Sequence, residues 1–320
     1  MKKVLLTDAI APAGEELLSK ETTVIRAPDS EPGTIRRLAP EADGILIRSK
    51  LPDDIFDAAP RVRAVAIHGT GTDLVPLASA SARGVMVSNL PGVNAQSVAE
   101  YCAMAMLMLA RRIFPITQSL RKETWDEARR MGAGARELAG LTLGIVGVGA
   151  IGGRLAKIAH HGFGMKVLGH QRRLERLPSE TQPATLHELL SNSDFVVLAC
   201  PLTHETKYLM NPNTFSLMRP GAWLINVGRG PVVQEEALIA ALRDKRIAGA
   251  MLDVYEHYRL ERGHPLFALD NVILTPHLAA VTQESRARAS VAAADEMLRM
   301  LRGERPRNLV NPEVLKKETT

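Results

Sequence analysis

Residues Leu141–Arg173 read LTLGIVGVGAIGGRLAKIAHHGFGMKVLGHQRR and decide how the chain is organised. Residues 141–146 form an apolar run of strand length, and the glycine motif GVGAIG at 147–152 follows it directly. Apolar residues at helical spacing occupy 151–162, and MKVL at 165–168 predicts a second strand. A strand, a glycine turn, a helix and a second strand form the unit that binds a dinucleotide.

Each glycine of the motif has a separate expected role. Gly147 permits the tight turn, Gly149 lets the backbone approach a pyrophosphate, and Gly152 lets the helix pack on the strand. The N–H groups of Ala150 and Ile151, in the first turn of the helix, then face the phosphates. Glycine turns often serve only to close a connection between a strand and a helix, but here the flanking elements match on both sides.

The end of the second strand predicts which dinucleotide is bound. An NAD-specific site usually has Asp or Glu about 20 residues after the glycines, where it accepts from the ribose 2′-hydroxyl. This chain has Gln171, Arg172 and Arg173 at that place and no acid before Glu175. Guanidinium groups bind a 2′-phosphate, so we expect NADP(H) in preference to NAD(H). The alternative is that both arginines belong to a solvated loop.

Composition places the chain among ordinary globular proteins and excludes several classes of function. It has 320 residues, enough for two domains, with 46% hydrophobic and 23% charged residues. The formal charge of +5 is scattered, whereas nucleic-acid binding needs a concentrated basic stripe. Cys102 and Cys200 have no metal-ligand spacing and are expected to be reduced thiols of the core. The most apolar helical stretch, Val98–Ala110, is too short to span a bilayer, so we expect a soluble, cytoplasmic protein without membrane or nucleic-acid partners.

Strands alternate with helices along the whole chain, which predicts parallel α/β sheets. The strands expected before the glycine motif lie at 4–6, 23–25, 44–47, 62–67 and 85–87, and those after it at 195–198, 223–227, 248–252 and 272–274. A helix is expected at 235–242. The first group lacks any GxGxxG, so it forms a different α/β unit from the doubly wound second one.

Three segments bear on how the units connect. Residues 95–113 predict one long helix, capped by Ser97 and apolar nearly all round, which is therefore buried and joins the domains. The polar segment 121–140 that follows reads as an ordinary loop. Residues 287–301 predict a last amphipathic helix, and 308–312 a returning edge. If that helix packs on the first unit, the domains comprise 1–98 with 283–320, and 99–282.

Four further motifs resemble one family, the D-isomer-specific 2-hydroxyacid dehydrogenases. They are NAQSVAE at 94–100, NVGRG at 226–230, LDV at 252–254 and TPHLA at 275–279. Their spacing and order match the family from about Gly44 to Asn311. The resemblance implies two doubly wound, Rossmann-like parallel-sheet domains: a flavodoxin-like substrate domain, 1–98 with 283–320, and a dinucleotide-binding domain, 99–282.

Two residues suit the reduction of a 2-oxo acid. That reaction needs a cation for the carboxylate and carbonyl and a proton donor for the developing alkoxide. Arg229 follows a strand in a glycine-flanked turn, and His277 follows another strand. Taken alone, Arg229 is equally a surface ion pair and His277 a satisfied loop histidine. The resemblance implies that they are the substrate-binding arginine and the acid/base histidine.

The resemblance assigns further residues position by position. Asp253 matches an acid beside the nicotinamide carboxamide, and the backbone of Val227 lies next to it. The loop after His68 matches one whose N–H groups receive the substrate carboxylate. The full set comprises Gly69, Thr70 and Gly71 for the carboxylate, Arg48 and Ser49 at the mouth of the substrate cleft, and Pro201 and Thr206 with Gln171 at the cofactor. Arg48 either reads a second anionic group or is merely solvated.

One position departs from the family pattern. The family has Glu five residues after the equivalent of Asp253, where it bonds the catalytic histidine, and this chain has Tyr258. A phenol can orient an imidazole but cannot stabilise imidazolium as a carboxylate does. Our hypothesis is that reduction falls off at lower pH than in relatives with Glu, unless Glu256 or Glu261 compensates.

We expect an NADP(H)-dependent reductase of small 2-oxo acids such as glyoxylate or hydroxypyruvate. Formate and phosphite dehydrogenases share the scaffold, so a different hydride donor is one alternative. A corepressor that senses dinucleotides is another, although Arg229 and His277 argue for catalysis. Relatives are usually homodimers joined through the cofactor domain, and the resemblance makes Trp125 and residues 121–140 the arm that reaches across.

Overall fold

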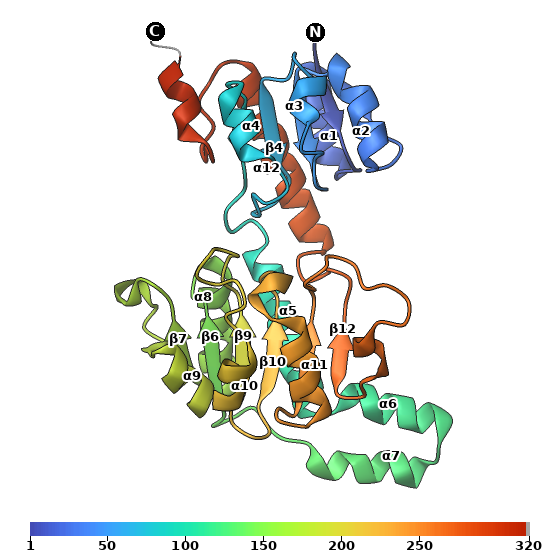
Figure 1. The fold of residues 1–320 in the computed structure, drawn as a ribbon, viewed down its shortest axis with the longest axis vertical. Helices are drawn as coiled ribbons and strands as arrows, with labels where there is room; N and C mark the ends of the chain where they lie inside the picture. The colour runs from blue at the N-terminus through green and yellow to red at the C-terminus, as the bar shows by residue number, and fades with distance from the viewer. Residues whose placement is uncertain (318–320) are drawn as a thin grey trace. The chain divides into compact units, whose positions relative to one another are not determined.

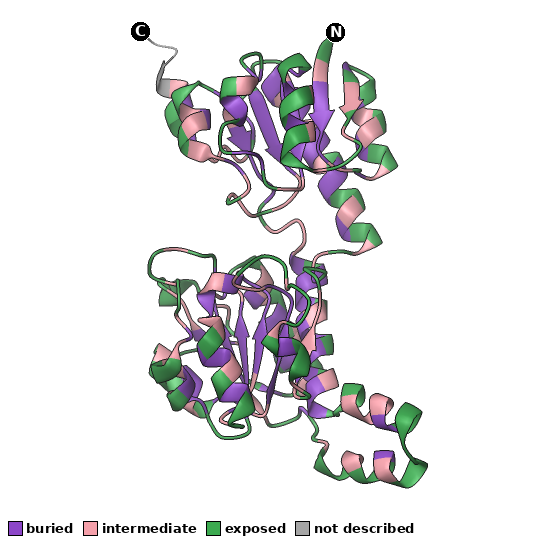
Figure 2. Cartoon of the chain, turned by 45° about the vertical axis from the view of Figure 1, so that its right-hand side comes forward, coloured by how far each residue is buried: buried purple, intermediate pink, exposed green. Residues whose placement is uncertain are grey.

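The computed structural model describes residues 1–317 and divides the chain into two compact units. Unit 1 comprises Met1–Asn94 and the chain from Val281 onward, and unit 2 comprises Ala95–Ala280. Both are built on a parallel sheet whose central strands are buried, as Figure 2 shows in purple. The two doubly wound α/β sheets predicted from the sequence are therefore confirmed.

The sheet of unit 1 has five strands in the order β2-β1-β3-β4-β5, which is the flavodoxin-like order. The strands are β1 (Lys2–Leu6), β2 (Thr22–Arg26), β3 (Gly44–Ile47), β4 (Ala64–Ile67) and β5 (Met86–Ser88). The helices between them are α1 (Pro12–Ser19), α2 (Pro32–Leu38), α3 (Ile55–Ala58) and α4 (Leu77–Ala82). The last helix of the chain, α12 (Gln283–Leu301), packs with α1 on one face through Ala289, Ala293 and Met297.

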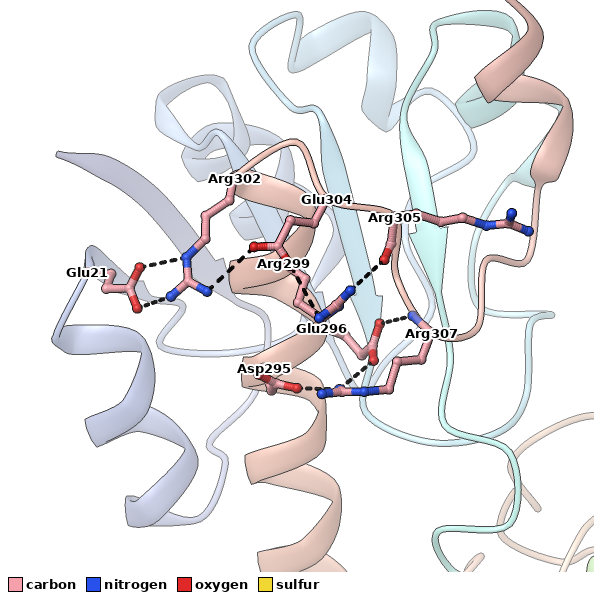
Figure 3. Close-up of polar contacts among 8 residues, drawn as sticks. All are labelled: Glu21, Asp295, Glu296, Arg299, Arg302, Glu304, Arg305 and Arg307. Carbon is pink, nitrogen blue, oxygen red and sulfur yellow. Dashed lines mark hydrogen bonds and ion pairs between the residues drawn. The ribbon is translucent and has the colours of Figure 1, made fainter.

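The chain after α12 returns to the edge of this sheet, as predicted. Leu309 pairs with Ser88 in an antiparallel bridge, and the N–H of Val310 donates to the carbonyl of Val87 at 2.8 Å. An ionic cluster at the end of α12 holds this return segment in place (Figure 3). In it, the backbone N–H of Arg307 donates to the buried carboxylate of Glu296 at 2.9 Å, and the guanidinium of Arg307 pairs with the same carboxylate.

The sheet of unit 2 has seven strands in the order β12-β11-β10-β9-β6-β7-β8, all parallel. They are β6 (Thr142–Val146), β7 (Lys166–His170), β8 (Gln182–Pro183), β9 (Phe195–Leu198), β10 (Trp223–Asn226), β11 (Gly249–Leu252) and β12 (Val272–Leu274). Helices α5 (Ala95–Ala110) and α8 (Ala150–Lys157) cover one face. Helices α9 (Leu186–Asn192), α10 (Pro212–Leu217) and α11 (Glu235–Arg243) cover the other (Figure 1). The strand order reverses beside β6, the switch point where α/β sheets bind ligands.

The long helix predicted at 95–113 starts where expected, but the prediction was wrong about its cap and about its end. The helix begins at Ala95, so Ser97 is a buried residue of its first turn and not its cap. Alanine and glutamine favour helix strongly enough to start it earlier. It ends at Ala110 because Arg112 is left-handed, with φ of 53°. Pro115 has no N–H and would clash with the carbonyl of the preceding turn, so one continuous helix cannot run through it.

Residues 113–131 form a helical hairpin, the second half of which lies in the segment 121–140 that was expected to be a loop. The hairpin consists of α6 (Ile113–Lys122) and α7 (Trp125–Met131) and projects from unit 2 (Figure 1). Thr124 and Glu127 form a capping box at the start of α7, a pattern already readable in the sequence. The helix α5 is also less buried than predicted, since Met104 and Leu107 are about two-fifths exposed.

Both cysteines, Cys102 and Cys200, are buried free thiols, as predicted. Burial raises the pKa of Cys200 to about 11 and raises that of Cys102 further, so both stay protonated. Within residues 1–317, no helix combines the length and apolar character that crossing a membrane needs.

Candidate active site

The glycine turn after β6 has the geometry that its three glycines predict. Gly147 has φ of +93°, and a Cβ there would lie 2.6 Å from the amide nitrogen of Cys200. A Cβ on Gly152 would lie 2.5 Å from the carbonyl oxygen of Gly147, so helix α8 packs directly on the turn. A Cβ on Gly149 would meet nothing within 4 Å. The open side of the turn is therefore at Gly149, where α8 begins with Ala150 and Ile151.

The basic pair lies beside this turn. β6 and β7 run in register, with Val146 opposite His170, and the N–H of Gly147 donates to the carbonyl of His170 at 2.9 Å. Arg172 and Arg173 follow β7 and are exposed. The side chain of Gln171 donates to the carbonyl of Arg173 at 2.7 Å and closes the bend.

The loop after β9 lies on the other side of the glycine turn. Its backbone at Cys200 contacts Gly147, as described above, and the hydroxyl of Thr206 donates to the carbonyl of Pro201 at 2.7 Å. Glu205 projects from the same loop, and its pKa is lowered mainly by the hydroxyl of Thr203, with a contribution from the charge of Arg172. The cofactor residues predicted from the sequence thus come from neighbouring loops at one edge of the sheet.

The turn that carries Arg229 is held by its neighbours. Asn226 is buried; its amide donates to the carbonyl of Arg229 at 3.2 Å and accepts from the N–H of Gly228 at 3.1 Å. A Cβ on Gly230 would lie 1.6 Å from the carbonyl oxygen of Tyr255. Only glycine permits this contact. The loops after β10 and β11 therefore lie against each other and fix the backbone of Arg229, two residues after Val227.

His277 lies on a strained turn after β12. It is exposed and left-handed, with φ of 57°, a conformation that costs a non-glycine residue about 1–3 kcal/mol. The carboxylate of Asp253, which is 1% exposed, accepts from the N–H groups of Leu278 at 2.7 Å and Ala279 at 2.9 Å. The N–H of His277 donates to the carbonyl of Asp253 at 3.0 Å. Asp253 therefore holds the turn on both sides of His277.

Two tyrosines that the sequence did not indicate, Tyr101 and Tyr255, complete this network through Thr275. The hydroxyl of Thr275 donates to Asp253 at 2.6 Å and shares a hydrogen bond of 2.5 Å with the hydroxyl of Tyr101 on α5. Tyr255 donates to the carbonyl of Thr275 at 2.8 Å, and burial raises the pKa of Tyr255 to about 12. No local pattern marks Tyr101, because it lies 174 residues from Thr275.

Tyr258 lies next to His277, as expected of a residue that replaces the family carboxylate. The ring centroids are 6.2 Å apart, with the planes at 71°, in an edge-to-face arrangement. The carboxylate of Glu256 is engaged elsewhere: it accepts from the hydroxyl of Tyr208 and, at 2.9 Å, from the N–H of Glu235 at the start of α11. Glu261 is exposed. This geometry favours Tyr258 over Glu256 as the neighbour of His277.

In unit 1, the loop after β4 presents backbone donors. The carbonyl of Gly69 accepts from the N–H of Leu90 at 2.7 Å, and the carbonyl of Thr70 accepts from the side chain of Asn89 at 2.6 Å. In the described part of the chain, the N–H groups of Thr70 and Gly71 have no hydrogen-bond partner. These two adjacent N–H groups are therefore available as donors to an acceptor from outside the loop.

His68 precedes this loop and is mostly buried. Its Nε2 shares a hydrogen bond of 2.7 Å with the hydroxyl of Ser290 on α12. Burial, aided by the charges of Arg48 and Arg286, lowers the pKa of His68 to about 4, so the ring is neutral at pH 7. Arg48 donates to the carbonyl of Ala9 at 3.0 Å, and the hydroxyl of its neighbour Ser49 donates to Asp8. No sequence pattern indicated the contacts of Asn89, Leu90 and Ser290.

Comparison with known proteins agrees with this geometry. Residues 103–279 match the family model of the D-isomer specific 2-hydroxyacid dehydrogenase, NAD binding domain. The chain is 37% identical over 331 residues to the glyoxylate reductase of Aeropyrum pernix, covering 98% of this chain and 97% of that protein. It is 36% identical to a glyoxylate/hydroxypyruvate reductase B of Salmonella paratyphi A, covering 92% and 94% of the two chains.

The chain belongs to the D-isomer-specific 2-hydroxyacid dehydrogenase family.

Solved structures share its fold. The TT0316 protein from Thermus thermophilus matches with a TM-score of 0.87 at 34% identity, covering 96% of this chain and 99% of that one. An NADPH-dependent glyoxylate/hydroxypyruvate reductase from Sinorhizobium meliloti, in complex with citrate, matches with a TM-score of 0.83 at 29% identity, covering 98% and 99%. The chain is thus a D-2-hydroxyacid dehydrogenase with a domain for a nicotinamide dinucleotide.

Proposed function

We propose that this dehydrogenase reduces small 2-oxo acids, glyoxylate or hydroxypyruvate, to 2-hydroxy acids with NADP(H). The observation that carries the proposal is His277, a proton donor held in a left-handed turn by the buried carboxylate of Asp253. Strain of this kind persists only where the surroundings impose it, and here the buried Asp253 does so, which supports a functional role for His277. The names of the similar reductases support the same substrate class.

The residues fit the cofactor because only glycine is tolerated at Gly147 and Gly152, while the space at Gly149 is open. The N–H groups of Ala150 and Ile151 would hold the pyrophosphate, with Pro201 and Thr206 on the facing loop. Val227 and Asp253 lie at the nicotinamide end of the site. When bound, the dinucleotide supplies or accepts the hydride.

Each unit supplies part of the chemistry. We assign unit 1 as the substrate-binding domain, whose Thr70 and Gly71 N–H groups bind the carboxylate. Arg229 of unit 2 binds the carboxylate and polarises the carbonyl, because a fixed guanidinium stabilises the charge that develops on oxygen. His277 gives its proton to that oxygen. Tyr258 orients the imidazole, and Arg48 lies with Gly69 beside the substrate.

We assign the preference for NADP(H) to Arg172 and Arg173. Both are exposed at the end of β7, one strand from the glycine turn, and Gln171 closes the bend that carries them. Guanidinium groups bind a phosphate through charge-assisted hydrogen bonds. The bound NADP in the Sinorhizobium meliloti reductase supports this choice for a relative at 29% identity.

We further propose a homodimer joined through unit 2. Its helices α5, α6 and α7 expose large apolar side chains: Met104, Leu107, Ile113, Phe114, Leu120 and Trp125. Such a surface is costly in water and is typical of a protein interface. Light scattering should show a monomer for the double variant Phe114→Asp with Trp125→Asp. The control Val291→Asp, at an exposed position of α12 in unit 1, should remain a dimer. A dimer that survives the double change would contradict this interface.

We also infer a cytoplasmic location. Cys102 and Cys200 are both free thiols. Free thiols are common in reducing compartments, where disulfides are rare. Fractionation of the source cells checks this location.

The test is a spectrophotometric assay with glyoxylate, hydroxypyruvate and pyruvate, each with NADPH and with NADH, at several pH values. Turnover that prefers NADPH would support the reaction and the role of Arg172 and Arg173. Turnover that prefers NADH would keep the reaction and overturn the role of the pair. No turnover of any 2-oxo acid by a protein that binds dinucleotide tightly would overturn the proposed reaction.

A further inference from the structure

The loop that presents N–H groups in unit 1 is held from one side only. Leu90 donates to the carbonyl of Gly69 at 2.7 Å, and Asn89 donates through its side chain to the carbonyl of Thr70 at 2.6 Å. A trans peptide is planar, so its carbonyl and the following N–H point in opposite directions. Fixing these two carbonyls toward residues 89–90 therefore points the N–H groups of Thr70 and Gly71 away from them.

The side chain of Asn89 is itself fixed at both ends. It is 8% exposed, and its Oδ1 accepts from the amide of Asn308. A carbonyl can only accept, so the NH₂ of Asn89 must face Thr70 and its oxygen must face Asn308. Without Asn308, the amide of Asn89 would lose one of the two partners that set its orientation, and its NH₂ would be held on Thr70 less firmly.

Asn308 belongs to the segment that returns from α12, and both of its flanks are anchored. Before it, Arg307 bonds through its backbone and its guanidinium to the buried carboxylate of Glu296 (Figure 3). After it, the N–H of Val310 donates to the carbonyl of Val87 at 2.8 Å. The anchoring leaves Asn308 little freedom to move away from Asn89.

We infer that Asn89 and Asn308 are positioning residues that set the affinity of the Thr70–Gly71 loop for the carboxylate of the 2-oxo acid. The inference rests on the proposed function, and neither residue touches the substrate in it. Asn89 fixes one peptide plane, Asn308 fixes Asn89, and the C-terminal segment thereby takes part in substrate binding. Loss of Asn89 lets the Gly71 N–H rotate away from its ligand.

The test compares Asn89→Ala, Asn308→Ala and the double variant with Asn311→Ala. Asn311 is the matched control: it lies on the same segment and is 2% exposed, and its side chain accepts from the N–H of Val87 and donates to the carbonyl of Val85, both at 2.9 Å. It makes no bond to the loop. Steady-state kinetics with glyoxylate and NADPH and thermal unfolding are measured for each protein.

We expect Asn89→Ala to raise KM for the 2-oxo acid about fivefold to tenfold, as the loss of one ordering hydrogen bond implies, with kcat and KM for NADPH within about twofold. Asn308→Ala should raise KM less, and should add nothing in the Asn89→Ala background. Asn311→Ala should lower the melting temperature without changing KM, which separates positioning from general loosening.

Two outcomes would count against this inference in different ways. An active wild-type enzyme whose KM is unchanged in both Asn89→Ala and Asn308→Ala overturns the positioning role alone. A rise in KM for Asn311→Ala equal to that of Asn308→Ala overturns it too, because KM would then follow stability. A wild-type protein that reduces no 2-oxo acid overturns the proposed function, and this inference with it.

Discussion

Replacing Asp253 by asparagine keeps the size of a buried side chain and removes the charge that holds the His277 turn. In the wild type, one carboxylate oxygen accepts from Thr275 and Leu278 and the other from Ala279. An amide has only one acceptor, so in the less costly orientation its NH₂ faces the N–H of Ala279. A buried donor left without an acceptor costs about 1–3 kcal/mol.

The free energy lost in Asp253→Asn is as large as the backbone strain of His277 that the wild-type carboxylate offsets. A left-handed, non-glycine residue such as His277 costs about 1–3 kcal/mol, so Asp253→Asn makes relaxation of the turn competitive with its strained form. Displacement of a catalytic group by about 1 Å can cost about 100-fold in rate. We therefore expect kcat for 2-oxo acid reduction to fall about 100-fold, with a melting temperature lower by about 2–4 °C per kcal/mol lost.

The assay follows kcat at saturating glyoxylate and NADPH, the dissociation constant of NADPH by fluorescence, and thermal unfolding. Thr275→Val removes one of the bonds to Asp253 and should give a smaller fall in kcat. Wild-type kcat in Asp253→Asn would refute the argument that Asp253 holds the turn. A loss confined to NADPH binding would instead assign Asp253 to the cofactor alone.

Three other predictions follow from the same geometry. Tyr258→Glu should move the upper pH limit of reduction in the kcat/KM profile up by about one pH unit, because a carboxylate stabilises imidazolium. An unchanged profile in Tyr258→Phe, together with a collapsed rate in Glu256→Gln, would instead assign Glu256 as the group that assists His277. Replacing Arg172 and Arg173 by serine should lower the NADPH-to-NADH ratio of kcat/KM at least tenfold, and an unchanged ratio would show that the pair is merely solvated. Burial lowers the pKa of His68 to about 4 in the folded protein, against its ordinary value of 6.5, so the unfolded chain binds the proton more tightly. Stability is thus complete above pH 6.5 and falls as the pH drops toward 4, by about 2 kcal/mol at pH 5, and chemical denaturation at pH 7.5 and 5 should show a smaller loss in His68→Gln.

Strands were the most predictable part of the fold. A strand buried on both faces of a parallel sheet is a short apolar run, and β3, β9 and β12 have the predicted bounds. The glycine turn was equally readable, since Gly147 and Gly152 occupy positions that a side chain would clash with. Both features depend on neighbours in sequence.

Helix boundaries were less predictable, although the signals were present. Polarity alone pointed to Ser97 as a cap, while helix propensity started α5 two residues earlier. Pro115 fits the first turn of a new helix, here α6, and Thr124 with Glu127 signals the start of α7. Helix propensity and the backbone chemistry of proline and the capping residues, rather than polarity, therefore decide these boundaries.

Contacts between distant residues had no sequence signal. Asn89 and Asn308 are 219 residues apart, and Tyr101 and Thr275 are 174 apart. Such side chains are ordinary polar residues until the fold brings them together, and their bonds depend on element positions that composition and spacing do not give. The site could be predicted as residue types, whereas the groups that orient it could not.

Asp253 shows what this difference means for function. The resemblance assigns it to the nicotinamide, yet in unit 2 its carboxylate accepts from the N–H groups of Leu278 and Ala279 and from the hydroxyl of Thr275. A buried carboxylate with three donors is stable, so it can impose an unfavourable conformation on its neighbours. The hydrogen bonds of Asp253 offset the strain of the left-handed His277 and thereby hold the backbone that carries the imidazole. Asp253 and His277 therefore act together, although the family motifs treat them as separate residues. A substitution at either should lower the rate of proton transfer.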